Sequence, residues 1–72
     1  MRHYFTFGQD HTHRVNNVTL DKDSVVEIVA DNQASARCKM FDTFDAKWAM
    51  QYTDDTLDMR YFPRGVVLTL RA

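Results

Sequence analysis

The chain has 72 residues, of which 44% are hydrophobic, and nine basic against ten acidic side chains give it a net charge of −1. This is the length of one domain, and the charge balance favours neither a strongly basic nucleic-acid-binding surface nor an acidic DNA mimic. A lone cysteine, Cys38, excludes an intramolecular disulfide, and the first residues have the pattern of neither a signal peptide nor a membrane span. We therefore expect a single cytoplasmic domain without membrane association.

The first thirty residues predict strands. Residues 2–7 alternate, with His3, Phe5 and Phe7 on one face. Asn16-Asn17, between two valines, predicts a type I′ turn that closes a small hairpin of residues 13–15 against 18–20. Residues 25–30 are rich in β-branched side chains and predict a further strand.

A helix and a strand are predicted next, over residues 31–52. Asp31 or Asn32 is the expected N-cap, and the helix should end near residue 44 or 45. Two adjacent ridges should form its apolar stripe, one of Ala36, Met40 and Phe44, the other of Ala34, Cys38 and Phe41. After the helix the period changes to two, which predicts a strand that buries Trp48, Met50 and Tyr52 on one face.

The last twenty residues predict a loop or a single helical turn at 53–56, and the alternation of Leu57, Met59 and Tyr61 offers a short edge strand as an alternative. Pro63 and Gly65 occupy the second and fourth positions of a type I turn at 62–65, and residues 66–70 predict the last strand. The expected fold is α+β: a small antiparallel sheet with one packed helix, in the order ββαββ, with an extra hairpin at 13–20.

One cluster has the chemistry of metal ligands. Asp10, His11 and His13 lie close together, and on an extended segment both imidazoles would share a face, with His3 able to approach if the first strand folds back. A catalytic zinc site needs three protein ligands, and no HExxH or comparable second element is present. The alternative interpretation is a polar loop before the hairpin, so a metal-binding protein is kept as an alternative only.

Catalytic patterns are missing from the sequence. Cys38 is expected on the apolar side of the helix, where a thiol is usually a small hydrophobic group. Gly8 and Gly65, the only glycines, cannot form a GxGxxG or P-loop phosphate cradle. We expect no catalytic residues, no cofactor and no enzymatic activity.

A partner-binding site is predicted at the turn that contains Tyr61, Phe62 and Arg64. Rigid aromatic side chains and an arginine beside a proline are the residue types that dominate interface energies. The alternative is a hairpin in which the rings are tucked under the turn. A small nucleic-acid-binding module is a second alternative. It would use basic side chains: Arg14, Lys22, Arg37, Lys39 and Arg64.

Several motifs together resemble a family of small uncharacterised proteins encoded by phages and prophages. They are Tyr4-Phe5-Thr6-Phe7-Gly8-Gln9, the His11/His13 pair with Arg14-Val15-Asn16, the Ala36-Arg37…Met40-Phe41…Phe44 helix, Lys47-Trp48-Ala49 with Gln51-Tyr52, and Tyr61-Phe62-Pro63-Arg64-Gly65. The family more often has glycine where this chain has Asn17 and Asp45. The resemblance implies a mobile-element setting, in which small proteins without catalytic motifs are often inhibitors of host machinery, anti-CRISPR proteins among them.

The resulting hypothesis is a non-enzymatic binding protein that occludes a bacterial host protein or ribonucleoprotein, such as a CRISPR–Cas effector. A 72-residue chain has a small core, so a homodimer is also considered.

Overall fold

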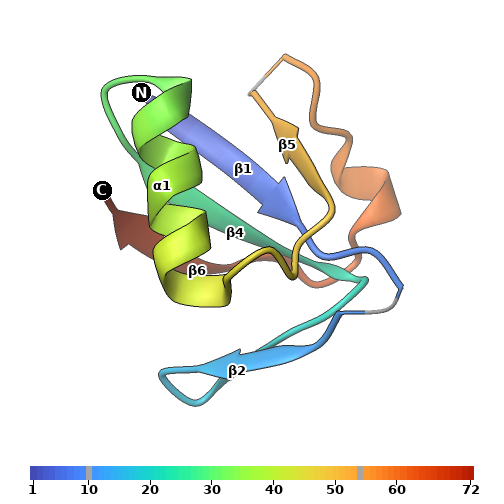
Figure 1. Ribbon diagram of the computed structural model, residues 1–72. Helices are drawn as coiled ribbons and strands as arrows, with labels where there is room; N and C mark the ends of the chain where they lie inside the picture. The colour runs from blue at the N-terminus through green and yellow to red at the C-terminus, as the bar shows by residue number, and fades with distance from the viewer. Residues whose placement is uncertain (10, 54) are drawn as a thin grey trace.

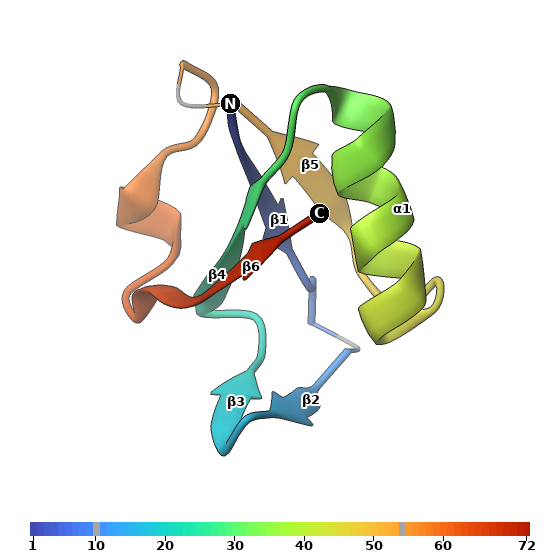
Figure 2. The ribbon, with the colours of Figure 1, turned by 90° about the vertical axis from the view of Figure 1, so that its left-hand side faces the viewer.

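The computed structural model describes residues 1–9, 11–53 and 55–72, and it confirms an α+β fold with one packed helix (Figure 1). The elements follow one another as β1 (Arg2–Thr6), β2 (His13–Val15), β3 (Val18–Leu20), β4 (Ser24–Val29), α1 (Gln33–Phe44), β5 (Met50–Tyr52), the 3₁₀ helix η1 (Met59–Tyr61) and β6 (Gly65–Arg71). Helix α1 covers one face of the main sheet, and the segment with η1 lies on the other side (Figure 2).

The main sheet has the strand order β5-β1-β4-β6 and is mixed. Strand β1 pairs antiparallel with β4 and β5, whereas β4 and β6 run parallel. The prediction of a wholly antiparallel sheet is therefore wrong. The parallel pairing arises because α1 and β5 intervene between β4 and β6, so the chain returns to the β4 edge in the same direction. The sequence did not predict this, because side-chain alternation carries no information on strand direction.

The predicted hairpin is confirmed as a separate two-stranded sheet of β2 and β3. Asn16 and Asn17 have φ angles of 52° and 65°, both positive as a type I′ turn requires. Leu20 at the end of β3 is fully buried, and Val15 and Val18 pack against the core. The hairpin is thus held by apolar contacts to the main sheet and helix.

Helix α1 begins and ends where the sequence indicates. The side chain of Asn32 caps it by accepting a 2.8 Å hydrogen bond from the backbone N–H of Ser35, and Asp45 follows its last residue. The ridge of Ala36, Met40 and Phe44 is buried in one core with Phe5, Val26 and Ile28 of the sheet and with Phe7, which follows β1.

The second predicted ridge of α1 is not buried. Ala34 and Cys38 are exposed, and Phe41 is 49% exposed. The prediction that Cys38 fills an apolar position is wrong, because a helix that lies on a sheet directs only a narrow stripe toward it and turns the adjacent ridge to solvent.

In strand β5, the side chains that share a face are not the ones predicted. Met50 pairs with Thr6 and Tyr52 with Tyr4, on the face away from α1, whereas Gln51 pairs with Phe5 on the helix face. Trp48 precedes the strand and also lies on the helix side, with its ring 5.1 Å from that of Phe5. The alternation fails because regular strand geometry begins only at Met50.

The alternative of an edge strand at 57–61 is wrong, since the chain forms η1 there. The carboxylate of Asp58 accepts a 3.0 Å hydrogen bond from the backbone N–H of Arg60 and so caps this 3₁₀ turn. The turn at 62–65 is confirmed: the Gly65 N–H donates to the Phe62 carbonyl at 2.8 Å, and Gly65 has a φ of 67°.

Among the described residues, no helix is long and apolar enough to span a bilayer.

Candidate functional site

A hollow of about 440 Å³ lies on the side of the sheet away from α1, between β5 and the end of η1. Its lining side chains are mixed in character: Thr6, Gln9, Lys22, Asp23, Met50, Tyr52, Tyr61 and Phe62, with Gly8 and Ala49. We call this hollow, with its exposed rim residues Met50 and Tyr61, the Tyr61 surface.

The rim of the Tyr61 surface is apolar and open to solvent. Tyr61 is 73% exposed and Met50 is 54% exposed. Met59, two residues before Tyr61 in η1, is also an exposed large hydrophobic residue. Large apolar side chains that border a concavity are typical of binding surfaces.

The other two residues of the predicted partner site have internal roles. The ring of Phe62 is half-buried, with its centroid 6.4 Å from that of Tyr52. Arg64 donates a 2.8 Å hydrogen bond to the Thr19 carbonyl and lies 3.3 Å from a carboxylate oxygen of Asp21. Of the three predicted residues, only Tyr61 projects its side chain into solvent without such an internal contact in the described part of the chain.

An ion pair holds the turn that presents Tyr61. The guanidinium of Arg60 lies 2.7 Å from Asp58, and this contact, with the backbone hydrogen bond of Arg60, keeps the pKa of the Asp58 carboxyl below its ordinary value. The same contact raises the pKa of Arg60. Both groups are at the surface, so the pair orders a local turn and adds little to global stability.

The predicted metal cluster is only partly placed, because Asp10 lies outside the described residues. The Nε2–H of His13 donates a 2.7 Å hydrogen bond to the Lys47 carbonyl, and the ring contacts Phe7 and Phe44 at centroid distances of 5.5 and 4.9 Å. His13 thus ties the hairpin to the end of α1. Within residues 1–9, 11–53 and 55–72, no group of three His, Cys, Asp or Glu side chains has the geometry to hold a metal ion.

The basic residues considered for nucleic-acid binding are distributed over separate elements. Arg14 is on β2, Arg37 and Lys39 are on α1, and Lys22 borders the Tyr61 surface. Arg64 is engaged by Thr19 and Asp21, as described above.

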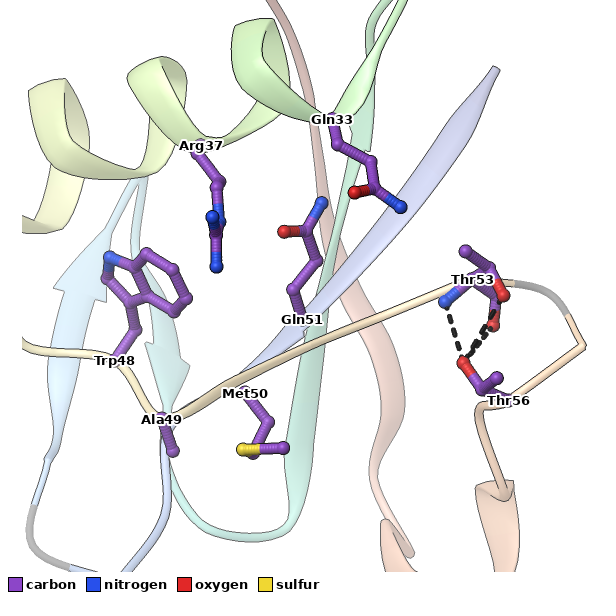
Figure 3. Close-up of a pocket in the computed structure, with 8 residues that line it drawn as sticks. All are labelled: Gln33, Arg37, Trp48, Ala49, Met50, Gln51, Thr53 and Thr56. Atoms are coloured by element: carbon purple, nitrogen blue, oxygen red, sulfur yellow. Dashed lines mark hydrogen bonds between the residues drawn. The ribbon is translucent and has the colours of Figure 1, made fainter.

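A second hollow, of about 420 Å³, lies between α1 and β5 (Figure 3). Gln33 and Arg37 come from α1, Trp48 and Gln51 come from β5 and the residues just before it, and Thr53 and Thr56 close one end. The Thr56 hydroxyl accepts a 2.9 Å hydrogen bond from the Thr53 N–H, and the Thr56 N–H donates to the Thr53 carbonyl. The described residues of the 53–56 segment therefore form a hydrogen-bonded turn. Asp54 lies outside them.

Three side chains have buried polar atoms without a hydrogen-bond partner in the described part of the chain, and two of these side chains line the second hollow. Among the described residues they are Nε2 of Gln51, Nε1 of Trp48, and both ring nitrogens of His3. His3 itself is fully buried, on the helix face of β1. Such groups are few in folded proteins, so each one calls for a physical explanation.

The sequence analysis did not find the second hollow. Gln33 and Arg37 are four residues apart, which places them on one face of a helix, but Gln51 is brought to them only by the β1–β5 register. That register was obscured by the assumption that Trp48, Met50 and Tyr52 share a face.

In comparisons with known proteins, no family model, no curated protein and no solved structure matches this chain.

Proposed function

We propose that this protein is a small non-enzymatic binding protein of phage or mobile-element origin that works in the cytoplasm of a bacterial host. It acts by occluding a host protein or ribonucleoprotein. The most specific form of this proposal is that the protein inhibits a CRISPR–Cas effector. The setting rests on the resemblance to phage-encoded proteins, which is an argument by analogy. The choice of the Tyr61 surface as the contact site rests on its geometry.

The observation that carries the proposal is the exposure of Tyr61 at the rim of a hollow. Its side chain is 73% exposed, and together with the 54% exposed Met50 it lines a concavity of about 440 Å³. Tyrosine and methionine are enriched in protein interfaces, and a tyrosine fixed in place loses little conformational entropy on binding.

The backbone under Tyr61 is ordered before any partner arrives. Asp58 caps η1 on one side, and the Phe62–Gly65 hydrogen bond closes the turn on the other. Arg64 anchors this turn to Thr19 of β3. A preorganised surface of this kind binds more tightly than a flexible one, since less entropy is lost on association.

The proposal is tested by affinity capture with the tagged protein from a CRISPR-bearing bacterial lysate, with and without nuclease, read by mass spectrometry. We expect one stoichiometric host protein, or one ribonucleoprotein, that is lost with Tyr61→Ala. The matched control is Phe41→Ala, which removes a half-exposed aromatic ring from the helix side of the molecule and should retain the partner.

Two results would contradict the proposal. Equal capture by wild type and a folded Tyr61→Ala variant would remove the Tyr61 surface from the account. Recovery of only nucleic acid, abolished by nuclease and by moderate salt, would indicate a nucleic-acid-binding module instead.

A further inference from the structure

Strand β6 forms one margin of the main sheet and, within the described part of the chain, pairs with β4 alone (Figure 2). It has seven residues, whereas β5 at the other margin has three. Edge strands are usually short, or carry lysine, proline or a bulge, because their free N–H and C=O groups can pair with another strand. Strand β6 contains neither lysine nor proline, and its one irregularity, at Val67, leaves residues 68–71 in regular register with β4. This half of β6 is therefore open to pairing.

The backbone of Thr69 and Arg71 points away from the sheet. The N–H of Ala72, directly after β6, donates a 3.0 Å hydrogen bond to the Val29 carbonyl of β4. Backbone groups alternate in direction along a strand, so those of Leu70 also point toward β4 and those of Thr69 and Arg71 point outward. Both of these residues are exposed. They offer N–H and C=O groups that a further strand would satisfy.

The side chains at this margin differ between the two faces of the sheet. On the helix face, Leu68 and Leu70 are half-buried and pack against the core. On the other face, Glu27 of β4 and Arg71 carry opposite charges, and neither is in an ion pair within the described part of the chain. The Thr69 hydroxyl donates a 3.3 Å hydrogen bond to Oε1 of Glu27, so this carboxylate lies toward β6. An added strand would meet apolar side chains on one face and an acid and a base on the other.

We infer that two copies of this chain form a dimer in which their β6 strands pair antiparallel about a two-fold axis at Leu70. Outward-pointing residues of an antiparallel pair exchange two hydrogen bonds, so Thr69 of each copy lies opposite Arg71 of the other. The two Leu70 side chains meet on the helix face. On the other face, Arg71 of each copy reaches across Thr69 to the Glu27 carboxylate of the other copy. An axis at Thr69 would instead place Arg71 opposite the irregular Val67, away from Glu27.

A second copy is the occupant of this edge that the charges favour. The acid and the base lie on one face of the same chain, and the two-fold axis brings each against its opposite, so the same ion pair forms twice. Leu68 of the second copy lies opposite Ala72, beside a hollow of about 410 Å³ between Ala72 and α1. Its burial there adds apolar contact to the main-chain hydrogen bonds.

Sedimentation velocity of the purified chain tests this dimer. The paired segments are short, so we expect a dimer that dissociates on dilution, with a Kd between about 1 μM and 1 mM. Arg71→Glu places two acids together at each contact and Glu27→Arg places two bases together, so each should raise the Kd about tenfold or more. Arg14→Glu makes the same charge change on exposed β2 and should dimerise as wild type does.

Mixing the two charge variants separates a lost contact from a lost fold. In a heterodimer of Arg71→Glu with Glu27→Arg, an acid faces a base at both contacts. An equimolar mixture should therefore sediment as a dimer again, at a concentration where each variant alone is monomeric.

Disulfide trapping tests the register. In a Cys38→Ser background, Leu70→Cys should give a covalent dimer on mild oxidation, because directly opposite residues of an antiparallel pair are close enough for a disulfide. Thr69→Cys should not, since the two copies of position 69 are offset by two residues along the strands.

A monomer at every concentration up to about 1 mM would overturn the inference. Unchanged dimerisation of Arg71→Glu, or no recovery in the mixture, would overturn it as well, and equal trapping at positions 69 and 70 would overturn the register. The dimer does not depend on the Tyr61 surface, so Tyr61→Ala should dimerise as wild type does. Failure here and failure of the proposed function are therefore separable.

Discussion

The guanidinium of Arg64 donates a 2.8 Å hydrogen bond to the main-chain carbonyl of Thr19, 45 residues earlier in the chain. The same side chain lies 3.3 Å from Asp21, and its backbone N–H donates to the Asp23 carbonyl at 3.0 Å. One residue therefore connects the turn before β6 to the end of the β2–β3 hairpin and to the loop that leads into β4. These contacts are structural, and Tyr61 is the more exposed side chain of the two.

Arg64→Ala should destabilise the fold by about 1 kcal/mol, because it removes a charge-assisted hydrogen bond to a main-chain carbonyl. Tyr61→Ala should change the free energy of unfolding by less than about 0.5 kcal/mol, as expected for an exposed side chain. Urea denaturation of the two variants checks this. A larger loss of stability in Tyr61→Ala than in Arg64→Ala would contradict this account.

His3→Leu should stabilise the protein by about 1 kcal/mol. It replaces a buried side chain, whose ring nitrogens lack partners among the described residues, by an apolar one of similar size. His3→Gln, which keeps buried polar atoms in a longer side chain, is the control and should not stabilise. The midpoint of urea unfolding is the measurement. A loss of stability in His3→Leu would mean that the imidazole has a hydrogen-bond partner in solution.

Asp45→Gly should stabilise the protein by about 1 kcal/mol. Asp45 ends α1 with φ 55° and ψ −135°, a conformation that strains an L-residue and suits glycine. Its backbone N–H donates to the Phe41 carbonyl at 3.0 Å, a bond that glycine retains. Asp45→Ala keeps the Cβ and should bring no gain, so thermal unfolding of the pair isolates the backbone effect. Equal stability of the two variants would argue against strain at this position.

The Asp58–Arg60 pair should give a local pH dependence. Because the Arg60 side chain and then its backbone N–H lower the pKa of Asp58 below 3.8, ionised Asp58 stabilises η1 above that pH. This contribution is lost as the pH falls below 3.8 through the lowered pKa. A carbon NMR titration of the Asp58 carboxyl should show a midpoint under 3.8 that rises toward this value in Arg60→Gln. An unchanged midpoint in Arg60→Gln would show that the side-chain contact is absent in solution.

Local signals in the sequence predicted the local parts of the fold. Asn16-Asn17 specifies its turn through positive φ, Asn32 specifies a helix start through its side-chain oxygen, and Pro63 with Gly65 specifies the last turn. Each of these depends on a few neighbouring residues. The resulting α+β class followed from them.

What the sequence did not predict depends on contacts between distant segments. The parallel direction of β6 follows from the path of the chain around β1 and β4, and the side on which Trp48 lies follows from where β5 begins to pair with β1. Asp58 lies in the segment 57–61, whose alternation suggested an edge strand, but it caps η1 instead. The Tyr61 turn was found from its residue types, but the internal contact of Arg64 with Thr19 could not be, because no local pattern relates residues so far apart.

Photo-crosslinking in bacterial cells tests the central claim most directly. A photoreactive phenylalanine analogue is placed at Tyr61, on the rim of the proposed contact surface, or at Cys38, which is exposed on the outer side of α1. The account predicts one dominant adduct with a host protein or an effector subunit from position 61 and none of that mass from position 38. No adduct from position 61, or the same adducts from both positions, would contradict the assignment of the Tyr61 surface as the binding site.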